Sequence, residues 1–281
     1  MTADNKKMKF AVIGDPIKHS KSPVMHNAAY SALGMNAEYS AVHVKKDDLE
    51  DFAHYARNNL NGFNVTVPHK ENIIQFLDGV SELSAKTGSV NTVTVKDGKL
   101  FGDSTDGYGL AEAVKESFDL QIEGKSFLFI GCGGTVKAVS YYLADEGAEA
   151  VRIANRTVSK AEQLAGKLRN TQKGGTVIEA VPLADKSAVS AAVAKTDIVI
   201  QATSLGLKDD DPSPFPEELI RPGLYMFDTI YKETAFLRNA QKHNIPCAGG
   251  FLMLIHQGAA SFRIWTGITP PLDVMKQSLG I

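Results

Sequence analysis

A cluster of glycines between a predicted strand and a predicted helix is the first place where this chain could do chemistry. The cluster consists of Gly131, Gly133 and Gly134. An apolar run precedes it at residues 126–130, a helix-compatible segment follows at 135–145, and a second β-rich run lies at 150–154. Glycines in such a β–α–β turn let backbone N–H groups approach a diphosphate, which then lies at the positive end of the helix. The segment therefore predicts a nucleotide-binding site.

The end of the second β-rich run indicates which nucleotide would bind. Turns that bind NAD are followed, about 20 residues on, by an acidic side chain for the ribose 2′-hydroxyl. Here the chain instead has Asn155, Arg156 and Thr157, with Lys160 one turn later. A guanidinium can stack on adenine and hold phosphate oxygens, whereas a carboxylate would repel a 2′-phosphate. The pattern favours NADP over NAD, although Arg156 and Lys160 alone are equally compatible with a solvated helix start.

Two hydroxyl groups, on Ser20 and Ser22, stand where a loop meets a predicted helix at Pro23 to Leu33. Ser22 is a residue type expected at the N-cap, and Pro23 is typical of the first helical position. Hydroxyl donors and the helix dipole would both suit a carboxylate at this place. Taken alone, the segment is explained more simply by a cap and a loop residue.

Lys70 follows a short predicted strand that Pro68 stops, and we expect a helix to begin at Pro68. A lysine in the first turn is disfavoured by the helix dipole, so its placement asks for a functional reason. His69 beside it is of a type that caps or packs at helix starts more often than it catalyses.

Two further polar residues stand at conspicuous places in predicted helices. Asp106 lies in a segment that opens a helix running to about Phe118, and Gln257 interrupts an apolar helix at Phe251 to Trp265. A buried amide needs hydrogen-bond partners, so Gln257 either tethers a backbone group or faces a ligand.

Composition sets the class of protein. A chain of 281 residues with 43% hydrophobic residues can bury a sizeable core, and two domains are expected at this length. The formal net charge of −2 offers no basic field for nucleic acid. No apolar run reaches the roughly 18 residues of a membrane span, and the two cysteines have no metal-ligand spacing. We expect a soluble cytoplasmic protein that needs no metal.

The predicted elements indicate an α/β protein. A buried strand is expected from Lys9 to Gly14, and a hairpin joins strands at 92–96 and 99–102 through Asp97-Gly98. Beyond the glycine turn, strands at 176–181, 197–202 and 225–228 alternate with helices near 159–168 and 185–194, which predicts a parallel sheet covered by helices. The acidic, proline-rich loop from Lys208 to Pro216 is expected to be exposed.

A set of motifs in fixed order resembles the shikimate dehydrogenase family. These motifs are SKSP, NVTVPHK, GSVNTV, STDG, GCGG, NRT, ATSLG and MLIHQ, and the likeness runs from Ile13 to about Phe262. The resemblance implies an N-terminal α/β substrate domain, a Rossmann-like NADP-binding domain, and C-terminal helices that return to the first domain. The expected boundaries are 1–104 with 246–281 for the substrate-binding and catalytic domain, and 105–245 for the NADP-binding domain.

The resemblance also implies an activity: an NADP-dependent alcohol dehydrogenase that reversibly reduces 3-dehydroshikimate to shikimate in aromatic amino acid biosynthesis. It makes Lys70 and Asp106 the catalytic pair. The implied substrate-binding residues are Ser20, Ser22, Thr66, Asn91, Tyr231 and Gln257. The implied cofactor-binding residues are Gly131, Gly133, Gly134, Asn155, Arg156, Thr157, Thr203 and Gly249.

The chain departs from the family pattern at a few positions. Ser89, Ser104 and Gln201 stand where Ala, Asn and Asn are usual, Thr135-Val136 replace small residues, and the segment after Tyr231 is shortened and lacks a proline. A paralogue acting on quinate or aminoshikimate therefore stays an alternative, although Ser22 favours shikimate, because quinate carries an extra hydroxyl beside its carboxylate. A non-catalytic NADP-binding sensor is a third alternative, which the retention of both Lys70 and Asp106 disfavours. The sequence leaves open whether the protein is a monomer or a homodimer.

Overall fold

The computed structural model describes residues 7–172 and 174–281, and the chain divides into two compact units. The first unit comprises Met1–Gly109 and Leu254–Ile281, and the second comprises Leu110–Met253. Each unit is built on its own six-stranded sheet with helices, which confirms the predicted α/β class. No helix among the described residues is both long enough and apolar enough to cross a membrane.

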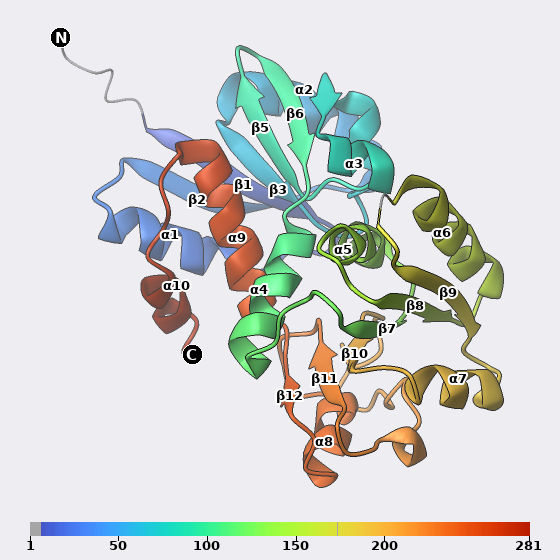
Figure 1. Ribbon diagram of the computed structural model, residues 1–281. Coiled ribbons are helices and arrows are strands. Elements are labelled where there is room, and N and C mark those ends of the chain that lie inside the picture. The colour runs from blue at the N-terminus through green and yellow to red at the C-terminus, as the bar shows by residue number, and fades with distance from the viewer. Residues whose placement is uncertain (1–6, 173) are drawn as a thin grey trace. The chain divides into compact units, whose positions relative to one another are not determined.

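The sheet of the first unit is mixed, with the strand order β2-β1-β3-β5-β6-β4 (Figure 1). Strand β1 (Met8–Gly14) pairs in parallel with β2 (Ala37–His43) and β3 (Gly62–Val65). The predicted hairpin is present as β5 (Thr92–Lys96) and β6 (Lys99–Asp103), and the short β4 (Gly79–Val80) adds to β6. Asp97 and Gly98 both have positive φ, 51° and 71°, as a tight hairpin turn of this kind requires.

Helices cover both faces of this first sheet. On one face α1 (Ser22–Ala32), α9 (Phe251–Thr266) and α10 (Leu272–Ser278) share a core with β1. On the other face lie α2 (Leu49–Asn59) and the 3₁₀ turn η2 (Asn72–Phe76), while η1 (Lys46–Asp48) leads into α2. Helix α2 buries Leu49, Phe52, Ala53 and Ala56, the i, i+3, i+4, i+7 spacing of one helical face. The short α3 (Glu82–Thr87) contacts β6.

The second sheet is parallel throughout, with the order β12-β11-β10-β7-β8-β9. Its strands are β7 (Ser126–Ile130), β8 (Ala150–Asn155), β9 (Val177–Pro182), β10 (Ile198–Gln201), β11 (Tyr225–Asp228) and β12 (Cys247–Ala248). The chain runs outwards from β7 through β8 to β9 and then returns to β10 on the other side of β7. Such a reversal creates a switch point at the carboxyl ends of the strands, where ligands bind in open α/β sheets.

The helices of the second unit are α4 (Asp106–Phe118), which begins in the first unit, α5 (Gly134–Asp145), α6 (Val158–Thr171), α7 (Lys186–Val193) and α8 (Ala235–Lys242). Helices α7 and α8 pack on one face of the sheet, and α5 and α6 contact β8. The loop before the 3₁₀ turn η3 (Glu217–Leu219) contains Phe215, which is only 2% exposed. The expectation of an exposed loop is therefore wrong at Phe215, because its ring joins the core beside α8.

The start of α1 differs from the prediction by one residue. Lys21 is the N-cap and Ser22 is the first helical residue, so Ser22 does not cap the helix. The hydroxyl oxygen of Ser20 accepts a hydrogen bond from the Ser22 N–H at 3.3 Å. Ser20 therefore serves the helix start from the preceding loop, and the hydroxyl of Ser22 is left for a tertiary partner.

The helix predicted to begin at Pro68 is absent. Residues 66–71 instead form turns, in which the His69 N–H donates to the Thr66 carbonyl, and the 3₁₀ turn η2 begins only at Asn72. His69 itself is fully buried and its Nε2 bonds the Val44 carbonyl at 2.6 Å, so it packs and anchors this turn. Lys70 therefore lies in no first helical turn and meets no helix dipole, and its contacts explain its placement.

Candidate active site

Lys70 and Asp106 form a closely packed ion pair in the first unit. The distance from Lys70 Nζ to Asp106 Oδ2 is 2.5 Å, and the two side chains are only 11% and 5% exposed. Asp106 is the first residue of α4, where the positive end of the helix dipole favours a carboxylate. Because little water reaches either group, each charge depends on the other and on nearby donors for compensation.

Asn91 completes the surroundings of that carboxylate. Its Nδ2 donates to the second oxygen of Asp106, Oδ1, at 2.9 Å, and lies 3.2 Å from Oε1 of Gln257. Its Oδ1 accepts from the backbone N–H of Thr105 at 2.8 Å, which fixes the orientation of the amide. Gln257 Nε2 donates to the carbonyl of Leu254 in its own helix, so it does tether a backbone group. The structure thus brings together four of the predicted residues: Lys70, Asn91, Asp106 and Gln257.

Behind Asn91 lies a buried polar network that the sequence analysis missed. Asn64 donates to Ser261 Oγ at 2.9 Å and accepts from the phenol of Tyr39 at 2.7 Å. Thr92 bonds both Ser261 and Asn91. Asn64 lies in β3, where all four residues are buried, and a buried amide in such a strand requires partners. That requirement is the signal by which Asn64, two residues before Thr66, could have been found.

The two predicted hydroxyls at the start of α1 have different partners. Ser22 is 5% exposed and its side chain hydrogen-bonds the phenol of Tyr39, a contact that opposes the rise in the pKa of Tyr39 caused mainly by burial. Ser20 accepts from the Ser22 N–H. Thr66, after β3, donates its N–H to the Ile13 carbonyl. A Cβ built on Gly14 would lie only 2.6 Å from the methyl group of Thr66. Ser20 and Thr66 therefore follow the carboxyl ends of neighbouring parallel strands, β1 and β3.

The glycine turn of the second unit leaves the start of α5 open. Gly131 has φ +116°, and a Cβ there would lie 2.7 Å from the carbonyl oxygen of Ala202. Gly133 caps α5 with no side-chain hydrogen bond, and a Cβ built on it meets nothing within 4 Å. The start of α5 at Gly134 therefore has a clear approach at a helix N-terminus, the arrangement that suits the diphosphate of NADP.

The last residue of β8 and the two residues that follow it carry an exposed cation. Asn155 Nδ2 donates to the Thr157 carbonyl at 2.9 Å, and Thr157 caps α6 without a side-chain hydrogen bond. Arg156 is exposed, and within the described part of the chain no carboxylate pairs with it. A guanidinium with this freedom at the end of the second strand fits a 2′-phosphate.

The remaining predicted residues follow the carboxyl ends of strands on the other side of β7. Thr203 comes after β10 and donates its N–H to the side chain of Gln201 at 2.5 Å. Gly249 follows β12, and Tyr231 lies in the loop after β11, 36% exposed, with its ring 5.6 Å from that of Phe251. Partial burial raises the pKa of Tyr231, so its phenol stays a neutral hydrogen-bond donor at physiological pH.

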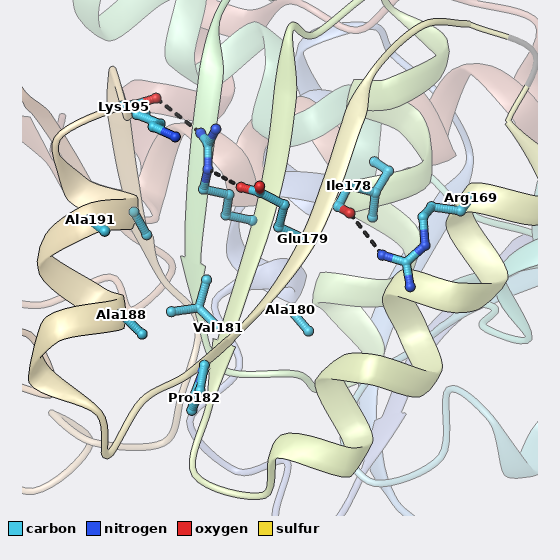
Figure 2. A pocket seen from close by; sticks show the side chains of 11 residues that line it. Arg169, Ile178, Glu179, Ala180, Val181, Pro182, Ala188, Ala191 and Lys195 are labelled. Atoms are coloured by element: carbon cyan, nitrogen blue, oxygen red, sulfur yellow. Dashed lines mark hydrogen bonds and ion pairs between the residues drawn. The ribbon is translucent and has the colours of Figure 1, made fainter.

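One pocket of the second unit has none of these residues in its lining. Figure 2 shows it around the edge strand β9, with a volume of about 460 Å³. Its arginines are bound to protein atoms, since Arg152 contacts Glu179 and the Lys195 carbonyl, and Arg169 donates to the Ile178 carbonyl. None of the predicted site residues lines it. Among residues 7–172 and 174–281 there is also no group of three side chains that could hold a metal ion.

Family models match most of the chain. The model described as shikimate dehydrogenase substrate binding domain matches residues 12–93, and the one described as shikimate / quinate 5-dehydrogenase matches residues 112–207. A third, described as shikimate 5′-dehydrogenase C-terminal domain, matches residues 250–279. The three matches include the glycine turn and every one of the predicted residues in the first unit except Asp106.

Individual relatives agree with these models. The chain is 40% identical over 273 residues to shikimate dehydrogenase (NADP(+)) of Rubrobacter xylanophilus, covering 95% of this chain and 94% of that one. Among solved structures, a shikimate dehydrogenase in complex with NADP+ is 35% identical with a TM-score of 0.90, covering 97% and 94%. The Thermus thermophilus enzyme in complex with NADP(H) and shikimate is 35% identical with a TM-score of 0.85, covering 96% and 98%. With its site geometry and near-complete coverage by these relatives, the chain belongs to the shikimate/quinate dehydrogenase family.

Proposed function

We propose that this protein is an NADP-dependent alcohol dehydrogenase that reversibly reduces 3-dehydroshikimate to shikimate. The observation that carries the proposal is the buried Lys70–Asp106 pair with Asn91 and Gln257 against it. Relatives that cover nearly the whole chain are named shikimate dehydrogenase (NADP(+)), and this supports the choice of substrate and cofactor. Bound NADPH would supply the hydride, and the residues of the chain would bind, orient and protonate.

Lys70 is assigned the role of proton donor. Reduction of a ketone places negative charge on its oxygen, and an ammonium within hydrogen-bonding reach stabilises that charge and then supplies the proton. Asp106 keeps the ammonium in place through a contact of 2.5 Å, and Asn91 holds Asp106 in turn. In the reverse direction the same lysine, once neutral, would accept the proton of the substrate hydroxyl.

The other roles follow the division of the chain into units. In the first unit, Ser20 and Ser22 would donate to the substrate carboxylate, for which the Ser22 hydroxyl would exchange its hydrogen bond to Tyr39. Thr66, Asn91 and Gln257 would bind the ring hydroxyls. Tyr231 would add a donor near the carboxylate. In the second unit, the glycine turn would hold the diphosphate and Asn155, Arg156 and Thr157 the 2′-phosphate end, while Thr203 and Gly249 would line the nicotinamide side. The proposal assigns the first unit to the substrate, the second to the cofactor, and the protein to the cytoplasm.

A paralogue acting on quinate or aminoshikimate is the second candidate, since one matching family model is described for both shikimate and quinate. Ser22 favours shikimate. Its side chain is nearly buried and bonded to Tyr39, and quinate would need room here for the extra hydroxyl beside its carboxylate. A sensor without turnover is disfavoured, because a buried Lys70–Asp106 pair is costly to maintain unless it serves chemistry.

Substitution of Lys70 by alanine tests the proposed chemistry. We expect Lys70→Ala to lower kcat by roughly 10²- to 10⁴-fold, the usual effect of removing a general acid, with little change in the Kd for NADPH. Lys7→Ala is a matched control, because Lys7 also pairs with a carboxylate, Glu38, but at an exposed site of the same unit. Near-normal turnover of 3-dehydroshikimate by Lys70→Ala would rule out the role assigned to this lysine.

A further inference from the structure

The loop that follows β11, residues 229–234, carries Tyr231, and we infer that Asp228 is the residue that positions this loop. The inference rests on the proposed function in one respect, because that function gives Tyr231 a substrate to bind. Asp228 touches neither substrate nor cofactor in this assignment. It is the last residue of β11, is 0% exposed, and has no assigned role in the reaction.

The carboxylate of Asp228 ties both ends of the loop to the end of the strand. Oδ1 accepts a hydrogen bond from the N–H of Ile230 at 2.9 Å. Oδ2 accepts from the hydroxyl of Thr234 at 2.6 Å. The same Thr234 oxygen accepts from the N–H of Leu237 as the N-cap of α8. One buried carboxylate therefore connects strand, loop and helix through three residues.

Neighbouring backbone closes around the base of the loop. The N–H of Thr229 donates to the Gln201 carbonyl at 3.0 Å, and the N–H of Gly250 donates to the Ile230 carbonyl at 3.1 Å. Gly206 has φ +106°, and a Cβ there would lie 2.8 Å from the methyl group of Thr234. The base is thus packed from three directions, whereas Tyr231 at its tip is 36% exposed. The position of the Tyr231 side chain depends on how firmly that base is held.

Gln201, one of the departures noted in the sequence, holds the adjacent loop in a similar way. It is the register partner of Asp228 at the end of β10 and is also 0% exposed. Its Oε1 accepts from the Thr203 N–H at 2.5 Å and its Nε2 donates to the Leu205 carbonyl at 2.7 Å. Two buried side chains at the ends of neighbouring strands therefore fold back to hold the loops that follow them.

The charge of Asp228 is held at a cost to stability. Burial raises the pKa of Asp228 to about 6, against the opposing effect of its bonds from Thr234 and Ile230. The folded protein therefore binds this proton more tightly than the unfolded chain, and stability falls as pH rises from the ordinary pKa of 3.8 to about 6. Asp228 is nevertheless ionised at neutral pH, although its ionisation lowers stability. This indicates that its negative charge has a role that a neutral side chain would fill less well.

No neighbouring charged side chain is needed to explain the raised pKa of Asp228. The charged residues of the loop and of α8 are Lys232, Glu233, Arg238 and Lys242, whereas the causes of the shift in the pKa of Asp228 are burial and the opposing bonds from Thr234 and Ile230. Lys232 is paired with Asp209 at the surface. The adjacent strand faces Asp228 with the amide residue Gln201, and the turn at Gly249-Gly250 has no side chains to offer. A proton on Asp228 turns one of its two acceptor oxygens into a donor, so either the Ile230 N–H or the Thr234 hydroxyl loses its acceptor.

A pair of substitutions at Thr234 tests the positioning role. Thr234→Val removes the hydroxyl that Asp228 holds, whereas Thr234→Ser retains it. We expect Thr234→Val to raise the KM for shikimate by about ten-fold with a much smaller change in kcat, and Thr234→Ser to stay within about two-fold of the wild type. Hydrogen exchange at the amides of residues 229–234 should accelerate in the valine variant alone, and this readout needs no substrate.

The pH profile provides the second test, through Asp228→Asn. In the wild type the KM for shikimate should rise as pH falls from about 7 to about 5, while the profile of Asp228→Asn should be flat over that range. The inference would be overturned if the Thr234→Val and Asp228→Asn variants kept the KM, the pH profile and the hydrogen exchange of the wild type. Failure of the wild-type protein itself to turn over shikimate would instead refute the proposed function, and hydrogen exchange would still decide the role of Asp228.

Discussion

Asp106 is the residue on which the proposed chemistry depends most closely, because its two oxygens receive different donors. Oδ2 faces the ammonium of Lys70 and Oδ1 faces the amide of Asn91. With both oxygens held, the carboxylate cannot rotate without losing a bond, so the ammonium stays at a fixed place. Loss of either partner would leave a nearly buried charge without compensation. The free-energy cost of that uncompensated charge is larger than the net free energy that the intact pair contributes to stability.

Arg156 supports a prediction about cofactor choice at the same scale. We expect Arg156→Ala to weaken NADPH binding far more than NADH binding, because only NADPH carries the phosphate that the guanidinium would hold. The control is Lys167→Ala, which removes an exposed positive charge from α6, the helix that follows Arg156, at a distance from its N-terminus. The Kd of each variant for both nucleotides decides the matter. Equal losses for the two nucleotides in Arg156→Ala would show that Arg156 does not read the phosphate.

At the residue scale the sequence identified donors better than it identified their partners. It singled out Lys70 for the wrong local reason, since no helix begins at Pro68, yet Lys70 does lie against Asp106. It treated Ser22 as a cap, but the hydroxyl bonds Tyr39. Hydrogen bonds such as these depend on which side chains meet in space, and neither residue type nor spacing contains that information.

The glycine turn between β7 and α5 is the element that should decide whether the second unit holds a nucleotide. Its two key glycines have different physical reasons for being glycine. At Gly131 the backbone is in the positive-φ region and the Ala202 carbonyl is too close for a Cβ. At Gly133 the backbone is extended and the adjacent space is open.

This difference predicts opposite outcomes for two alanine substitutions. Gly131→Ala should destabilise the protein by about 1–2 kcal/mol or more, from backbone strain and the clash with Ala202. Gly133→Ala should leave the melting temperature nearly unchanged but weaken NADPH binding, because the new methyl group occupies the diphosphate approach.

Gly166→Ala is the control for these variants, since Gly166 lies in α6 with open space around it, and alanine there should be neutral or stabilising by up to about 1 kcal/mol. Melting temperature and NADPH Kd are measured for all three variants. Undiminished NADPH affinity in Gly133→Ala would contradict the placement of the diphosphate.

Elements with strong local signals were predicted closely. The strands at 126–130 and 225–228 match their predicted limits, and the Asp97-Gly98 turn joins β5 and β6 as expected. Helix starts were less accurate where a loop side chain or a turn intervened, as at Ser20 before α1 and at His69 before η2. Apolar periodicity fixes the middle of an element, whereas its ends depend on hydrogen bonds from outside it.

At the scale of the whole molecule, the least predictable feature is the polar network that joins the N-terminal third of the chain to the C-terminal helix α9. Asn64 bonds Ser261, which lies 197 positions away, and Asn91 bonds Gln257 across 166 positions. Short-range patterns cannot pair such distant residues. The helix that brings them in, α9, was predicted as an element, and the family resemblance supplied its return to the first domain.

The stability of the first unit should depend on pH through His26. This ring is fully buried, stacks on Tyr39 at 4.3 Å, and has no hydrogen-bond partner at either nitrogen among the described residues. Burial lowers the pKa of His26 to about 3 from 6.5. The folded state therefore holds His26 neutral while the unfolded chain protonates below pH 6.5, so this stability is present above pH 6.5 and is lost as pH falls towards 3.

The corresponding prediction concerns His26→Met, which removes the titration and keeps an apolar side chain. Between pH 7 and pH 5 the wild type should lose about 2 kcal/mol of unfolding free energy through this residue, and His26→Met should not. Urea unfolding followed by the fluorescence of Trp265, the single tryptophan, reports on this unit, because its ring is 5.8 Å from His26. His54→Met, at an exposed histidine of α2, is the control. An identical pH dependence in His26→Met and wild type would contradict the assignment.

The central claim is that this chain oxidises shikimate with NADP+ as cofactor, and a steady-state assay of the purified protein tests it most directly. Initial rates are measured for shikimate, quinate and aminoshikimate, each with NADP+ and with NAD+. We predict the highest kcat/KM for shikimate with NADP+. A higher kcat/KM for quinate or aminoshikimate would reverse the substrate assignment, and the absence of turnover with every pair would contradict the claim outright.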